Sequence, residues 1–288
     1  MSAGKAVALG LVASLLGGTA FAQDLTIRDF VGTVNITTGD AEVSVTRDHR
    51  RLDVDGLDID GGIDKPGRSG VCGSSSGWFG GSKKTDIKDF AQLDIRLPEG
   101  ATLKIENSLL ALDVSDTALS EADIELTGCL GARLGDVLDA RVAQSGSGST
   151  ELGRIGDLKL RKSGSGRIRL NEVGTLDLAA SGSGDMDIGR IGVSGQIAKS
   201  GSADVGIGEA VGPLRLSMSG SGDAVVESGA ITELTVSKSG SGRVDIGASV
   251  ESAKIKASGS GDVRISSTPS RIEQATSGSM RVSIGGSD

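Results

Sequence analysis

The chain of 288 residues contains no tyrosine, one tryptophan and four phenylalanines. Large aromatic side chains fill most globular cores, so this composition leaves aliphatic residues to form a thin core. Histidine is equally scarce, and the single copy, His49, excludes zinc sites that use several histidines. It lies in the charged segment Arg47–Arg51, which is typical of a solvated strand end or turn.

The chain has fewer basic than acidic residues, and it has no long apolar run. With 30 Lys and Arg against 38 Asp and Glu, the net charge of −8 argues against the basic surface that nucleic-acid binding needs. The apolar run from Ala6 to Leu16 is too short to cross a membrane, and no later run approaches the required length. We therefore expect neither a nucleic-acid partner nor a membrane span.

The first 22 residues have the layout of a secretory signal peptide. Lys5 precedes the apolar run, and the small-residue triplet Ala20-Phe21-Ala22 follows it, which predicts cleavage before Gln23. Cleavage would change the net charge from −8 to −9, because it removes one lysine and no acid. We expect an exported protein in the periplasm or outside the cell.

Cys72 and Cys129 are the two cysteines of the chain. In an exported protein they can form one disulfide that holds a loop to the body of the fold. The pairing depends on a Cα separation that sequence does not give, so two unpaired, buried thiols remain the alternative.

A repeat dominates the C-terminal part of the chain. Ser-Gly-Ser recurs at intervals of 18 to 20 residues, and degenerate copies precede the first full one at Thr127-Gly128-Cys129 and Asn107-Ser108. The full copies begin at Ser145, Ser163, Ser181, Ser200, Ser219, Ser239, Ser258 and Ser277. A fixed period of this length is typical of a solenoid.

Between these segments, apolar and polar residues alternate in two short stretches per repeat, which predicts two short strands with one buried face. Ile168 and Leu170 follow one Ser-Gly-Ser segment, and Leu176 and Leu178 precede the next. No stretch has the period of a crossover helix. Stacked repeats of this kind give an all-β fold, a parallel β-helix of about ten coils, right-handed by the usual preference of parallel connections. The Ser-Gly-Ser-Gly segments are predicted to form its corners, since glycine adopts positive φ without strain.

We expect one β-helical domain over residues 23–288. Residues 23–106 contain strand-like runs without Ser-Gly-Ser-Gly corners and an irregular loop over 61–85. This part is predicted to form an N-terminal β cap on the coils of residues 107–288, because an open end would expose unpaired strand edges.

The segment Leu93–Glu106 combines a strand, a Pro-x-Gly turn and a second strand, and Ser-Gly-Ser-Gly followed by Asp or Arg recurs after it. These features resemble the bacterial family described as putative auto-transporter adhesin, head GIN domain, over roughly residues 25–288. The resemblance implies an exported β-helical protein of adhesin type. It supplies no site residues.

Two patterns that could indicate a catalytic or calcium-binding site do not hold in this sequence. Gly73-Ser74-Ser75-Ser76-Gly77 matches the serine-hydrolase pattern G-x-S-x-G, but that motif needs a histidine later in the chain, and His49 precedes it. The calcium-binding nonapeptide of RTX proteins fails because its aspartate position falls on the inward residue Met186. We expect a protein that is not an enzyme and has no required cofactor.

Three aspartates follow successive corners at the same phase, so stacking places Asp185, Asp204 and Asp223 in one column. Neighbouring carboxylates in such a column can bind Ca²⁺ between them. The alternative is a hydrated row whose repulsion is relieved by salt and by Arg167 and Arg243 on its two sides.

Trp78 and Phe79 lie in the loop over 61–85, beside glycines and before two lysines. An aromatic pair in an irregular loop suits contact with a partner, although it could instead cover the end of the β-helix. We predict a non-catalytic protein that binds another protein or a cell-envelope polysaccharide. A β-helical carbohydrate-active enzyme and a Ca²⁺-dependent binding module are the alternatives.

Overall fold

The computed structural model describes residues 6–7, 23–49, 51–66, 71–72 and 86–285. It is nearly all β and confirms the predicted β-solenoid of about ten turns. The chain divides into two compact units, Met1–Gly148 and Ser149–Asp288. The right-handed winding, the capping role of residues 23–106 and the single domain over 23–288 stay predictions.

In the first unit, strands of mixed direction precede the long strand β8 (Ala101–Val114) along the chain. β2 (Asp24–Arg28) and β3 (Val31–Thr38) both pair with β8 in parallel, while β4 (Glu42–Arg47) runs antiparallel to β7 (Ala91–Leu97). The other elements of this part are β1 (Ala6–Val7), which pairs with β4, the antiparallel pair β5 (Asp53–Asp55) and β6 (Asp58–Asp60), and the short 3₁₀ helix η2 (Ile87–Asp89). Gly100, with φ of +78°, lies in the predicted turn between β7 and β8.

The first coils follow directly in the same unit. β8 pairs in parallel with β9 (Leu119–Gly128) and β10 (Ala132–Leu134), and β9 pairs in parallel with β11 (Val137–Gly146). Thr127 and Gly128 are in register with Ser145 and Gly146, so the degenerate copy of the repeat occupies the predicted corner position.

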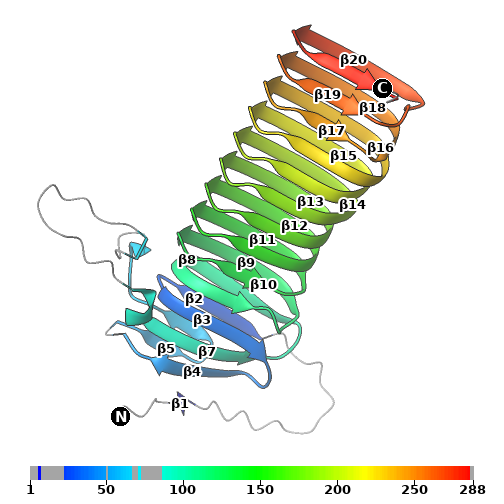
Figure 1. Cartoon of the computed structure of the whole chain (residues 1–288). Coiled ribbons are helices and arrows are strands. Elements are labelled where there is room, and N and C mark those ends of the chain that lie inside the picture. Colours follow the sequence, from blue (N-terminus) through cyan, green and yellow to red (C-terminus); the bar gives the residue numbers. More distant parts are fainter. Residues whose placement is uncertain (1–5, 8–22, 50, 67–70, 73–85, 286–288) are drawn as a thin grey trace, which may run out of the picture. The chain divides into compact units, whose positions relative to one another are not determined.

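In the second unit, five long strands are stacked in parallel, as Figure 1 shows. They are β12 (Thr150–Gly164), β13 (Ile168–Gly182), β14 (Met186–Gly201), β15 (Val205–Gly220) and β16 (Ala224–Gly240). The stack continues through the shorter strands β17 (Val244–Ile246), β18 (Ser249–Gly259), β19 (Asp262–Ile265), β20 (Arg271–Gly278) and β21 (Arg281–Ile284).

The prediction of two short strands per repeat is wrong for β12 to β16. Each of these strands spans nearly a whole coil, because pairing with a neighbouring coil continues through the bend between the two apolar stretches. The bend itself contributes an unpredicted buried column that contains Ile155, Val173, Ile191 and Ala210 in register.

The predicted apolar pairs lie in the interior as expected. Ile168 and Leu170 are buried, and so are Leu176 and Leu178 on the same strand. The first glycine of each Ser-Gly-Ser-Gly corner confirms the predicted positive φ, and Gly182, at +118°, is typical, whereas the second glycine of the corner, such as Gly184, does not have positive φ. A Cβ at Gly182 would overlap the carbonyl oxygen of Gly164 one coil below. The corner therefore needs glycine both for its conformation and for close stacking.

Candidate functional site

The three aspartates of the predicted column lie on successive corners, directly before strands that pair in register. The backbone N–H of Asp204 donates to Oδ1 of Asp185 at 3.2 Å, and that of Asp223 donates to Oδ1 of Asp204 at 2.8 Å. The N–H of Arg243 donates to Oδ1 of Asp223 at 2.7 Å. We call Asp185, Asp204 and Asp223 the aspartate ladder, since each carboxylate accepts a hydrogen bond from the backbone of the next coil.

These contacts give the ladder a structural role. A hydrogen bond from a backbone N–H to a carboxylate is charge-assisted, and here it joins two coils at an exposed corner. Calcium takes six to eight oxygen ligands, whereas each ladder carboxylate already uses one oxygen within the stack. Within the described ranges, no group of three or more His, Cys, Asp and Glu is arranged to hold a metal ion. Binding of Ca²⁺ by the ladder and a hydrated row of carboxylates stay the two alternatives of the sequence analysis.

The arginines on either side of the ladder act differently from one another. The guanidinium of Arg167 lies 3.8 Å from Oδ2 of Asp185 and so can reduce the negative charge at that end. At the other end, Arg243 contacts Asp223 through its backbone N–H, while its guanidinium lies 3.9 Å from Asp245.

Three buried lysines each directly precede a corner of the second unit. Lys162, Lys199 and Lys238 are 5%, 4% and 4% exposed, although lysine is almost never fully buried. Nζ of Lys162 donates to the carbonyl oxygen of Gly164 at 3.4 Å, and Nζ of Lys238 donates to that of Gly240 at 3.1 Å. We call these three residues the interior lysines.

The interior lysines and the aspartate ladder attract one another across the corner wall. Burial lowers the pKa of all three lysines, and nearby aspartates oppose that shift. For Lys199 the opposing groups are Asp204, Asp223 and Asp185, which are the whole ladder. The fold thus supplies cations of its own on the inner side of a column of like charges.

The outer faces of the coils carry charges that pair along the stack. Arg190 lies between Glu172 and Glu209 of the adjoining coils, at N–O distances of 3.7 Å and 2.5 Å. Arg161 donates two hydrogen bonds to the carboxylate of Asp177, at 2.8 Å and 3.1 Å. Such exposed pairs contribute little stability individually, but they favour the pairing of neighbouring coils in the native order.

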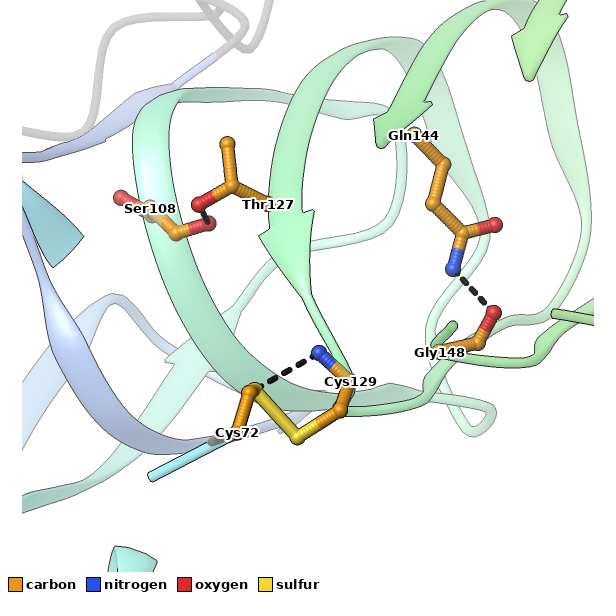
Figure 2. Close-up of a disulfide and its surroundings, with 6 residues drawn as sticks. All are labelled: Cys72, Ser108, Thr127, Cys129, Gln144 and Gly148. Atoms are coloured by element: carbon orange, nitrogen blue, oxygen red, sulfur yellow. Dashed lines mark hydrogen bonds between the residues drawn. A yellow bond between two sulfur atoms is a disulfide. The ribbon is translucent and has the colours of Figure 1, made fainter. Parts of the chain in front are cut away.

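In the first unit, Cys72 and Cys129 form a disulfide with a Cα separation of 5.3 Å. Cys129 follows Gly128 at the first corner and takes the place that a serine has in later copies of the repeat. Figure 2 shows the bond beside this corner, where Thr127 Oγ1 donates to the carbonyl oxygen of Ser108 at 3.5 Å. The disulfide therefore anchors Cys72 to the solenoid.

Other residues singled out in the sequence contribute less. Trp78, Phe79 and the segment Gly73–Gly77 lie outside the described residues. The sequence predicts a solvated His49, but its ring stacks on Phe90 with centroids 5.8 Å apart and is therefore partly shielded from water. Its Nδ1 is buried without a hydrogen-bond partner in the described structure.

Comparison with protein families concerns the second unit. Residues 189–287 match the family described as "Putative auto-transporter adhesin, head GIN domain". The match confirms the resemblance for these residues, and its extension toward residue 25 stays a prediction. No curated protein matches the chain.

The GIN-domain match begins within β14 and extends past β21, so it includes Asp204, Asp223, Lys199 and Lys238. The family description suggests an adhesin-like, exported protein and does not suggest an enzyme. Among the described residues, no helix has the length and apolar character needed to cross a membrane.

The interior lysines were not predicted, although the sequence contains a signal for them. The alternation that buries Leu158 and Leu160 reaches Lys162 in the same phase, and lysine again precedes the corner at 199 and 238. The general preference of lysine for the surface concealed that phase.

Proposed function

We propose that this protein is an exported, non-catalytic binding protein of the adhesin type, which contacts a cell-envelope polysaccharide or another envelope protein. The match of residues 189–287 to a family described as an auto-transporter adhesin head carries this proposal. A signal peptide over residues 1–22 would deliver the chain to the periplasm or the cell surface.

The chemistry of the corners supports a binding protein over an enzyme. A catalytic site needs titratable groups that converge on a substrate. The groups that recur at the corners instead contact the stack, since the aspartate ladder accepts backbone hydrogen bonds, and Lys162 and Lys238 donate to corner carbonyl oxygens.

For the contact region we propose Trp78 and Phe79. They follow Cys72 closely in sequence, and the disulfide to Cys129 fixes that cysteine at the first corner. An aromatic pair near such an anchor suits recognition of a sugar ring or an apolar protein surface.

Binding of purified residues 23–288 to immobilised envelope polysaccharides and envelope proteins tests the proposal, with Ca²⁺ and with EDTA. We expect saturable binding under both conditions, at least about tenfold weaker for Trp78→Ala/Phe79→Ala, because loss of two aromatic contacts costs about 1.4 kcal/mol or more. Leu138→Ala/Val193→Ala is the matched control, since both side chains are exposed apolar groups elsewhere, at 69% and 61%. Absence of saturable binding in both conditions would contradict the proposal, and release of new sugar ends would indicate an enzyme instead.

A further inference from the structure

The fourth residue of each Ser-Gly-Ser-Gly corner varies with one buried residue of the coil below. That buried residue, the interior corner residue, directly precedes the corner of its own coil, as Lys162 precedes Ser163. The fourth position is glycine in most coils of the second unit, but it is alanine at 203 and methionine at 280. Ala203 occupies the place above Ala180, and Met280 occupies the equivalent place above Ala257. Both exceptions therefore follow a coil whose interior corner residue is small.

Glycine occurs where that interior residue is long. A Cβ at Gly184 would overlap the carbonyl oxygen of Gly166 and lie 2.5 Å from Nζ of Lys162. A Cβ at Gly222 or Gly261 would likewise meet a carbonyl oxygen of the coil below first and the ammonium group of Lys199 or Lys238 next. At these three corners the backbone of the coil below and the lysine ammonium group together exclude a larger fourth residue.

The interior column also spaces its charges. Its members lie in register, in the order Lys162, Ala180, Lys199, Met218 and Lys238. A neutral residue separates each pair of lysines, so the ammonium groups belong to coils about 10 Å apart instead of about 5 Å. Repulsion persists even so, because Lys238 contributes to the lowered pKa of Lys199.

We propose that this interior corner column is a register lock, which lets each coil pair only with the coil that follows it in sequence. The coils need such a device, because the corners and apolar pairs are nearly identical from one coil to the next. If β14 paired with β12 and skipped β13, Lys199 would stack directly on Lys162, and the methyl group of Ala203 would meet the Lys162 ammonium group. Both consequences oppose the wrong pairing.

A double-mutant cycle at the Ala180–Ala203 corner tests the size rule without adding charge. Ala180→Met overfills the corner, and Ala203→Gly leaves it underfilled. The double variant recreates the native combination of Met218 with Gly242. We expect each single variant to lower the urea midpoint and the double variant to recover at least half of the summed loss.

Two readouts separate a register lock from simple packing. Dilution from urea should return a smaller native fraction for each single variant than for the wild type, and the double variant should recover that fraction. Met218→Lys, which places three lysines on adjacent coils, should lower the native fraction more than Met218→Leu does. Additive losses in the cycle, or recovery of the urea midpoint without recovery of the native fraction, would overturn the proposal.

Discussion

Replacement of Asp204 by alanine removes the middle carboxylate of the aspartate ladder. Oδ1 of Asp204 accepts the backbone N–H of Asp223 at 2.8 Å, so alanine leaves that N–H without its acceptor. An intramolecular hydrogen bond contributes about 0.5–1.5 kcal/mol, and water can reach this exposed corner. Repulsion from Asp185 and attraction to Lys199 are lost together and partly offset each other. We expect the free energy of unfolding to fall by about 1 kcal/mol.

Asparagine is the matched control, because its amide oxygen keeps the acceptor and removes only the charge. We expect Asp204→Asn to change the free energy of unfolding by less than about 0.5 kcal/mol. If the three ladder residues contribute equally, replacing all of them lowers the free energy of unfolding by about 3 kcal/mol for alanine and by about 1.5 kcal/mol or less for asparagine. Urea unfolding followed by circular dichroism resolves that difference.

Two results would refute the structural account of the ladder. Equal losses for alanine and asparagine would show that the carboxylate charge, and not the hydrogen bond, stabilises the corner. A rise in the wild-type melting temperature with about 1 mM Ca²⁺ that disappears in Asp204→Ala would show that the ladder binds the cation. We expect Ca²⁺ to leave the melting temperature unchanged.

Three further predictions follow from the other contacts. Burial lowers the pKa of Lys199 below its ordinary value of 10.5, so the folded chain holds fewer protons there than the unfolded chain. The urea midpoint should therefore rise as pH increases toward 10.5, and Lys199→Met should weaken that rise. Arg190→Glu should lower the free energy of unfolding by about 1–2 kcal/mol, against less than about 1 kcal/mol for Arg190→Gln, because only glutamate repels Glu172 and Glu209 as well. Cys129→Ser removes a cross-link that closes 57 residues, and calorimetry should show the first unit destabilised by up to about 4 kcal/mol.

Tyrosine and cysteine do not interfere with the pH prediction in this chain, whereas Lys104, whose pKa is raised by its hydrogen bond to Glu106, opposes the rise. The chain contains no tyrosine, whose phenol would titrate in the same range, and its two cysteines are joined in a disulfide. A flat urea midpoint over the same pH range would mean that the ammonium groups of the interior lysines are better hydrated than their burial indicates.

The coil period, the corners and the paired apolar columns could be predicted from sequence because each depends on local pattern. Positive φ at Gly182 and burial of Ile168 and Leu170 follow from glycine conformation and from alternation along one strand. The merged long strands and the column through Val173 could not be predicted, because they depend on pairing that continues through a bend.

The candidate site could likewise be predicted from the sequence only in part. The spacing of Asp185 and Asp204 placed them in one column, but their role depends on which way each carboxylate turns relative to the N–H of the next coil. Lys199 lies inside because Gly222, one coil away, leaves space for its ammonium group. Neither fact is present in any single repeat.

Because the corner residues stabilise the stack, we expect the binding surface to lie elsewhere in the chain. A corner residue that contacts the next coil tolerates only a change that keeps its hydrogen bond, whereas a residue outside the stack that contacts a binding partner is free of that constraint. Asp204→Asn should therefore leave envelope binding unchanged while Trp78→Ala/Phe79→Ala weakens it. The opposite pattern, with normal urea midpoints for both variants, would place recognition on the exposed corner and assign the ladder a role in binding that its backbone hydrogen bonds do not require.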